Sequence, residues 1–399
     1  MKKFMVIAAA LTMALAANAQ TSPEAKAIKK MKSYNEVLEA LKANEASFSN
    51  EDKAFVYNKL VDLAIAENGN AEKAAIEAQL AKDEAKQQEL NAAKNLAAYN
   101  AIDNALKCNA VDQAGKYRKK NAGRLMTIRN SMVSAGLDSY NTKDYSGAMK
   151  YFGAFVETRN DALFAEADFS REQNFGMIAY YAALAAYFNK DMGKTINYAD
   201  VALKSTDRDS TVTDNEVLIV KLGALEEQAK TAAIDTVTFI KYVKETYDVY
   251  PDNENVFGKL VALYDESGNK EKAVEILNAR LAKNPDDVMA NAYLGQNAQN
   301  EQKYDEAIQS YSRAVAARPT FLVAKMNLGV CYLNKAVAII ESNTDARGVL
   351  KADVKGDVMD SLNKAKETLE AVKAADPDKQ QVNWAYPLER VNYVLENIQ

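Results

Sequence analysis

The chain has 399 residues, of which 48% are hydrophobic, 15 are Gly and 6 are Pro. This composition is too apolar for a disordered chain and too poor in turn-forming residues for a many-stranded sheet, so we expect a large all-α protein. The formal net charge of −5 argues against a nucleic-acid-binding protein, which needs a net basic surface to contact phosphates.

Residues 1–19 have the pattern of a secretory signal peptide. Lys2 and Lys3 precede the apolar run Phe4–Ala16, and Ala17-Asn18-Ala19 is a small-x-small cleavage pattern. We expect export and cleavage before Gln20. The alternative is a retained membrane anchor, but the run is shorter than the roughly 20 residues that a spanning helix needs. The residue directly after the cut is Gln20, not the Cys that a lipoprotein signal places there. The sequence therefore predicts a periplasmic or secreted protein that is not a lipoprotein and has no transmembrane segment after cleavage.

Residues 20–123 are predicted to form an N-terminal helical region. Ser22-Pro23-Glu24 and the pair Ser49 and Asp52 are helix starts, which predict helices ending near Asn44 and near Gly69. Residues 71–107 are rich in Ala, Lys, Glu and Gln and have few large apolar residues, so we expect a half-exposed helical pair. The alternative is a partly mobile arm. The basic cluster at 116–124 is interpreted as a solvated helix start.

A 34-residue period runs through the second half of the chain. Pro251, Pro285 and Pro319 are 34 residues apart, as are Gly295 and Gly329. A period of this length is typical of repeated helical hairpins. Small residues allow two helices to cross closely, and Pro ends a helix because it lacks the backbone donor. The pattern therefore predicts hairpins that stop and restart in phase.

At these residues the sequence resembles the tetratricopeptide repeat family, most closely over 257–285 and 288–319. The positions that carry the resemblance are Gly295, Ala307, Tyr311, Ala314 and Pro319. In the family's packing, Gly295 and Ala307 would mark the contact within a hairpin, and Tyr311 would fill the space between successive hairpins. The resemblance implies a right-handed α-solenoid of about five to six repeats, in an exported repeat protein of a Gram-negative bacterium.

Weaker repeats are predicted on both sides of this stretch. Residues 124–251 hold degenerate units, in which Gly136, Ala148 and Phe152 match the motif. Residues 252–399 hold the clearer units. There, Gly329 and Ala365 are separated by 24 more residues than Gly295 and Ala307, which places an insertion at about 335–357. We expect this insertion to be a polar hairpin extension. The final segment, which begins near Trp384, is expected to be a capping helix.

The residue types that most enzymes and metal sites use are scarce. The chain has no His, which removes the commonest general base and neutral metal ligand. Cys108 and Cys331 are the only Cys residues. An oxidising compartment permits a disulfide between them, but free thiols are favoured because Cys331 lies within an expected packed helix. We expect no enzyme activity, no cofactor and no metal site.

By resemblance, the first helix of each hairpin lines a concave surface that binds a protein or peptide. The candidate groove residues are Asn255, Asp265, Met289, Ala292, Gln296, Gln299, Asn300, Val323 and Met326. The basic residues with which one branch of the family grips a terminal carboxylate are missing at the matching positions. The alternative is that the apolar members are buried against neighbouring helices. Residues 343–357 are a second contact candidate.

A different function class stays open. The aromatic residues Tyr180, Tyr181, Tyr187, Phe188 and Tyr198 are close in sequence and offer rings for stacking sugars, as in a glycan- or small-ligand-binding envelope protein. Their helical spacing also fits core packing. The burial of these rings distinguishes the two interpretations.

Overall fold

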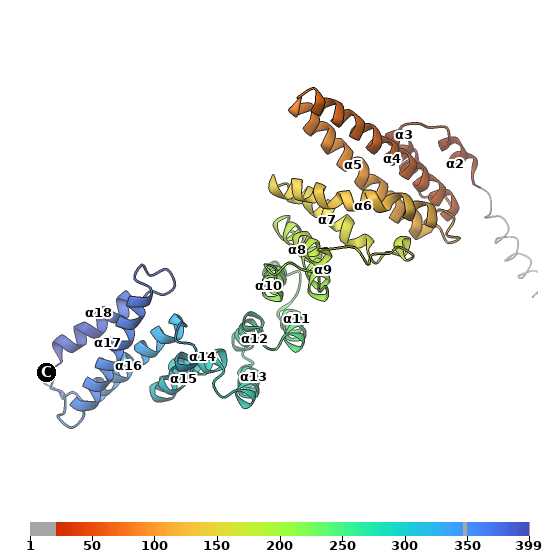
Figure 1. Ribbon diagram of the computed structural model, residues 1–399. Helices are drawn as coiled ribbons and strands as arrows, with labels where there is room; N and C mark the ends of the chain where they lie inside the picture. The colour runs from red at the N-terminus through yellow and green to blue at the C-terminus, as the bar shows by residue number, and fades with distance from the viewer. Residues whose placement is uncertain (1–20, 346–348, 399) are drawn as a thin grey trace, which may run out of the picture. The chain divides into compact units, whose positions relative to one another are not determined.

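A computed structural model describes residues 21–345 and 349–398, so the expected signal peptide lies outside the described residues. Within the described residues, the regular secondary structure is α-helical apart from an isolated β-bridge between Thr344 and Leu350 and a single short 3-10 helix, η1 (Ala162–Phe164). The predicted all-α class is confirmed. Successive helices pair as antiparallel hairpins (Figure 1).

The chain divides into two compact units, Met1–Asp235 and Thr236–Gln399. This division falls between Asp235 and Thr236, whereas the sequence analysis placed a repeat boundary after residue 251. The helices of unit 1 are α2 (Pro23–Ile28), α3 (Tyr34–Asn44), α4 (Asn50–Leu80), α5 (Glu84–Val111), α6 (Arg118–Asn141), α7 (Tyr145–Thr158), α8 (Phe175–Phe188), α9 (Met192–Lys204) and α10 (Asp214–Lys230). Those of unit 2 are α11 (Thr236–Val249), α12 (Glu254–Glu266), α13 (Lys270–Lys283), α14 (Val288–Asn300), α15 (Tyr304–Ala317), α16 (Leu322–Asn343), α17 (Lys355–Ala375) and α18 (Ala385–Asn397).

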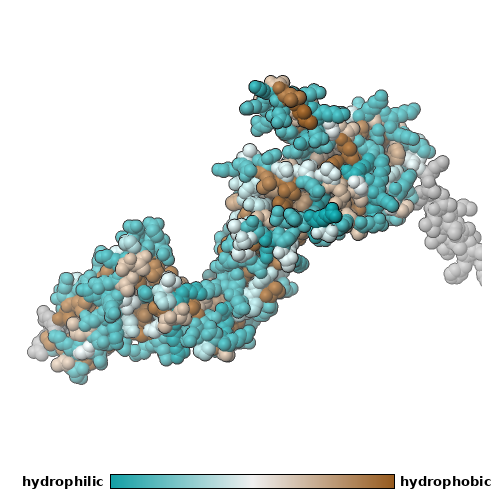
Figure 2. Space-filling model, viewed as in Figure 1, coloured by the Kyte–Doolittle hydropathy of each residue, from teal (hydrophilic) through white to brown (hydrophobic). Residues whose placement is uncertain are grey.

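In unit 1, the short helices α2 and α3 are followed by the long hairpin of α4 and α5. Ser49 and Asp52 form the predicted capping box at the start of α4. The predicted end near Gly69 is wrong, because α4 continues to Leu80. A glycine inside a helix costs only about 1 kcal/mol, and strong helix formers follow Gly69. The tip is exposed at Ile76 and Leu80, where Figure 2 shows a hydrophobic patch, so the expected half-exposed helical pair is confirmed.

In three hairpins, a glycine of the first helix lies opposite a large side chain of the second helix. A Cβ atom added at Gly295 of α14 would lie 2.9 Å from ring atoms of Tyr311 on α15. One added at Gly136 of α6 would lie 2.4 Å from the ring of Phe152 on α7. One added at Gly329 of α16 would lie 2.8 Å from Cγ of Leu369 on α17. The same packing therefore recurs in three hairpins, including the one that carries the insertion.

The insertion is mostly helix, which corrects the expected polar hairpin extension. With it, α16 has 22 residues and α17 has 21 residues. Leu333, Ala336 and Val358 are buried in the core that α16 shares with α17 and α18. Among the described residues, α16 alone meets the length and hydropathy of a membrane-spanning helix. Its buried face packs against α15 and α17.

The helix α18 covers the outer side of α17. Leu388 and Val391 are buried in this contact. Trp384 lies at the start of α18, and its indole N–H donates a 2.7 Å hydrogen bond to the carbonyl oxygen of Asp376. The Asp376 carboxylate accepts backbone N–H groups from Gln380 and Val382, which lowers its pKa. These bonds fix the turn that returns α18 onto α17.

A buried arginine organises unit 1. Arg129 of α6 has 0% exposed surface, and its guanidinium contacts Glu172, which also pairs with Arg159. Arg129 Nε donates to Thr158 Oγ1 at 2.8 Å, and the guanidinium lies 3.9 Å from the centre of the Phe155 ring. These contacts tie the segment between α7 and α8 onto the core of unit 1. Sequence reasoning did not find this cluster.

Candidate functional site

A hollow of about 170 Å³ lies between α14 and α16, which we call the α14–α16 hollow. It is lined by Met289, Ala292, Tyr293, Gln296, Tyr311, Phe321, Val323, Ala324 and Asn327. Most of these side chains are apolar or aromatic, and the polar ones end in amide or phenol groups. No charged side chain lines the hollow, so it is suited to an uncharged part of a ligand.

Tyr311 forms the floor and is held from two sides. Its hydroxyl donates to Gln299 Oε1 at 3.1 Å on α14 and accepts a hydrogen bond from Asn327 Nδ2 at 3.3 Å on α16. Burial raises the pKa of Tyr311, so the phenol stays protonated and keeps its role as a donor. Tyr311 therefore joins successive hairpins, in agreement with its predicted filling role.

Tyr293 forms one wall and links α14 to α12. Its hydroxyl donates a 3.2 Å hydrogen bond to the carbonyl oxygen of Gly258. Its ring lies edge-on to Phe257, with the ring centres 5.8 Å apart. Gly258 leaves room for this contact, because an added Cβ would lie 2.8 Å from the Tyr293 hydroxyl. The wall is therefore positioned before any ligand arrives.

Four of the nine predicted groove residues meet at this hollow, namely Met289, Ala292, Gln296 and Val323. Gln296 is exposed and Val323 is 45% exposed, so these two side chains are not simply core residues. The hollow is also lined by Tyr293, Phe321 and Asn327, which sequence reasoning did not include among its candidates. Phe321 lies two residues after the helix stop at Pro319, outside the helical positions from which the groove candidates were chosen.

The other predicted groove residues lie outside the hollow. Gln299 is engaged by Tyr311, Asn300 is exposed at the end of α14, and Met326 packs against the core of α16 to α18. Asn255 and Asp265 lie on α12. Burial raises the pKa of Asp265, although Lys270 opposes this shift. The structure thus gathers a smaller site than the sequence predicted.

The aromatic cluster of unit 1 is mostly packed. Tyr198 is 3% exposed, and its hydroxyl donates to Glu157 Oε1 at 2.5 Å. Tyr180 is half-buried beside Tyr181. Phe188 is exposed but stacks on Tyr145, with the ring centres 4.8 Å apart. Tyr198 is therefore too deeply buried to stack on a sugar. Phe188 and Tyr180 contact other aromatic rings of the same cluster.

Both cysteines are buried free thiols in the structure. Cys108 Sγ donates to the carbonyl oxygen of Ala54 at 3.3 Å in unit 1, and Cys331 is packed in unit 2. Burial raises the pKa of each thiol to about 12. At neutral pH both thiols are therefore protonated and unreactive. Within 21–345 and 349–398, no three His, Cys, Asp or Glu residues gather as metal ligands would.

The 34-residue period coincides with a fixed packing, in which Gly295 of one helix receives Tyr311 of the next and the hairpin ends at Pro319. The repeats are tetratricopeptide-like.

No family model matches the chain. The chain is similar to the peroxisomal targeting signal receptor of Candida glabrata, with 30% identity over 112 residues, which is 28% of this chain and 18% of the receptor.

The chain is also similar to the peroxisomal targeting signal receptor of Saccharomyces cerevisiae, with 27% identity over 139 residues, which is 34% of this chain and 22% of that receptor. The matches therefore span less than a quarter of either receptor. Among solved structures, a tetratricopeptide repeat protein from Bacteroides fragilis covers 67% of this chain and 98% of its own length, with 16% identity and a TM-score of 0.32.

Proposed function

We propose that this protein is a non-enzymatic scaffold that binds a protein or peptide through the α14–α16 hollow. The observation that carries the proposal is the convergence of Met289, Gln296 and Val323 on one hollow whose floor and wall are already fixed by hydrogen bonds. A preformed, water-accessible apolar surface favours binding because little ordering entropy is lost. The partial similarity to targeting signal receptors supports a role in recognising a peptide.

The lining suggests what part of a partner is recognised. Met289, Val323 and Phe321 offer apolar surface for one aliphatic side chain. Gln296 and Asn327 carry amide groups that both donate and accept hydrogen bonds, which suits the backbone of an extended segment. We therefore expect an uncharged, extended peptide segment with an aliphatic anchor.

Crosslinking tests this site. A photoreactive amino acid at Gln296 should capture a defined partner from native cells, identified by mass spectrometry. The variant Met289→Glu/Gln296→Glu places two charges at the hollow and should lower recovery at least tenfold. The control Val274→Glu/Gln309→Glu adds the same charges at exposed positions on α13 and α15 and should leave recovery unchanged. Equal recovery with both variants, with circular dichroism showing folded proteins, would contradict the proposal.

We also propose that the scaffold works in the cell envelope, on the basis of the signal-peptide pattern in residues 1–19. Expression in a Gram-negative host should place the protein in the periplasmic fraction, with Gln20 as the first residue by N-terminal sequencing. Replacing Ala17 and Ala19 with Leu should block cleavage. Cytosolic protein that still carries residues 1–19 would rule out this location.

A further inference from the structure

A second hollow of about 560 Å³ lies in unit 1, between the start of α6 and the segment that follows α7. We call it the α6 hollow. Arg118, Lys119 and Met126 line it from α6, and Leu163 and Glu166 line it from η1 and the residues after it. Its volume is within the range of pockets that hold small ligands or short peptide segments. Neither the proposed scaffold function nor the comparisons account for it.

The basic cluster at 116–124 is only partly neutralised. Lys120 and Arg124 both pair with Asp62 of α4, and the ammonium group of Lys116 lies 5.2 Å from the centre of the Tyr117 ring. Those three cations are therefore engaged by the protein itself. The other two cations of the cluster line the α6 hollow.

Arg118 and Lys119 have no acidic partner within the described part of the chain. Arg118 Nε donates to the neutral side chain of Asn109 at 2.9 Å, and Lys119 makes no ion pair there. Of the acids near the hollow, Asp161 accepts from Asn109 and from the Leu163 backbone. Glu166 is the one acid in the lining. Two cations face one carboxylate, so the lining carries a net positive charge.

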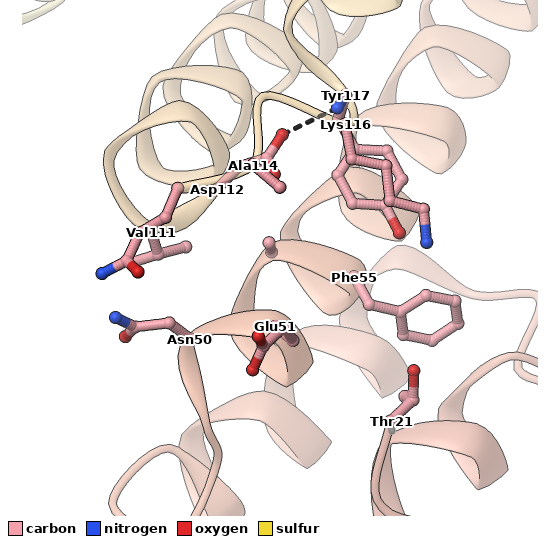
Figure 3. Close-up of a pocket in the computed structure, with 11 residues that line it drawn as sticks. Thr21, Asn50, Glu51, Phe55, Val111, Asp112, Ala114, Lys116 and Tyr117 are labelled. Carbon is pink, nitrogen blue, oxygen red and sulfur yellow. Dashed lines mark hydrogen bonds between the residues drawn. The ribbon is translucent and has the colours of Figure 1, made fainter. Parts of the chain in front are cut away.

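Both walls of the α6 hollow are fixed. On one side, the Asp112 carboxylate accepts the Tyr117 backbone N–H at 2.7 Å, which closes the turn that leads into Arg118 (Figure 3). Gly115 allows this turn because its φ of 65° is in the left-handed region. On the other side, Arg129 and Arg159 hold Glu172 and thereby the segment that contains η1. The backbone that carries Arg118 and Lys119 is therefore fixed beside the apolar side chains Met126 and Leu163.

We propose that the α6 hollow binds an acidic segment of a partner protein. An acidic side chain of the partner would pair with Arg118 and Lys119. A neighbouring aliphatic side chain would lie on Met126 and Leu163. The charge complementarity favours an acidic partner, and the apolar side chains favour one with aliphatic residues beside the acid. This site is independent of the α14–α16 hollow, so either proposal can fail without the other.

Fluorescence anisotropy with the full chain tests the proposal. The probe is the peptide Leu-Asp-Leu-Glu-Leu-amide with an uncharged fluorophore on its N-terminal nitrogen, and its Asn/Gln isostere is the uncharged comparison. We expect saturable binding of the acidic probe, at least tenfold weaker binding of the isostere, and weaker binding in 500 mM than in 50 mM NaCl. Equal binding of the two peptides, or no saturable binding up to 1 mM probe, would overturn the proposal.

Variants assign the binding to this hollow. Arg118→Gln/Lys119→Gln should weaken probe binding at least tenfold, whereas Lys29→Gln/Lys30→Gln removes two exposed cations outside the hollow and should not. Ala165→Trp fills the hollow without changing its charge and should also weaken binding. Loss of binding in Met289→Glu/Gln296→Glu, with the α6 variants unaffected, would assign the probe to the other hollow and refute this inference.

Discussion

At the scale of single residues, the close helix contact depends on the absence of one methyl group. The Tyr311 ring fills the space over Gly295, and its hydroxyl is bonded to both Gln299 and Asn327. The ring therefore cannot shift away without losing those hydrogen bonds. This double constraint makes Gly295 more sensitive to substitution than a helical glycine in open space.

Gly295→Ala should destabilise unit 2 by about 1–2 kcal/mol, because the overpacking cost of about 1–3 kcal/mol exceeds the gain of up to about 1 kcal/mol in helix propensity. Urea unfolding monitored by circular dichroism measures the change. Gly356→Ala is the matched control, since nothing lies within 4 Å of the added Cβ in α17. It should be neutral or slightly stabilising. A Gly295→Ala protein as stable as this control would disprove the packing argument.

At the scale of elements, the sequence predicted what depends on local pattern. The capping box at Ser49, the hairpin of α14 and α15 and the contact at Gly295 all follow from spacing and residue size. The end of α4 was misplaced because glycine is a weak signal where helix formers continue beyond it. The insertion at 335–357 has no period to compare with, so its helical form was not predictable from the repeat.

The sites were predictable only in part, for a related reason. Met289, Gln296 and Val323 share a helical phase that the repeat fixes, whereas Tyr293 reaches the hollow through a contact with Gly258 in the preceding hairpin. The Arg129 cluster joins residues 43 apart that belong to no repeat position. Such contacts arise from tertiary packing. Because these residues do not recur at the repeat period, a single sequence gives no indication that they come together.

Arg129→Met should destabilise unit 1 by about 3–5 kcal/mol, because it leaves Glu172, which is largely buried, with Arg159 as its one basic partner. Hydrogen exchange should quicken in residues 159–174, which Arg129 ties to the core. Arg129→Met/Glu172→Leu should recover part of the stability, since the carboxylate is then absent. Lys107→Met, which breaks an exposed pair with Asp103, should change stability by less than about 0.5 kcal/mol. An effect of Arg129→Met no larger than this control would refute the structural role.

At the scale of the whole molecule, a stack of hairpins has an apolar face wherever a neighbour is missing. In unit 2, α18 supplies that neighbour for α17. Its inner face buries Leu388 and Val391, while Tyr386 and Tyr393 on the outer face are 68% and 65% exposed. The same helix therefore offers an informative substitution and a matched control on opposite faces.

Leu388→Asp/Val391→Asp should detach α18, because each change places a charge in an apolar contact. The apolar core that α18 shares with α16 and α17 would then be partly exposed and should drive self-association. Size-exclusion chromatography with light scattering should show larger assemblies for this variant. Tyr386→Asp/Tyr393→Asp adds the same charges to the outer face and should elute like the unmodified protein. If both variants elute alike and unfold at the same urea concentration, α18 does not protect the stack, and another element must cover α17.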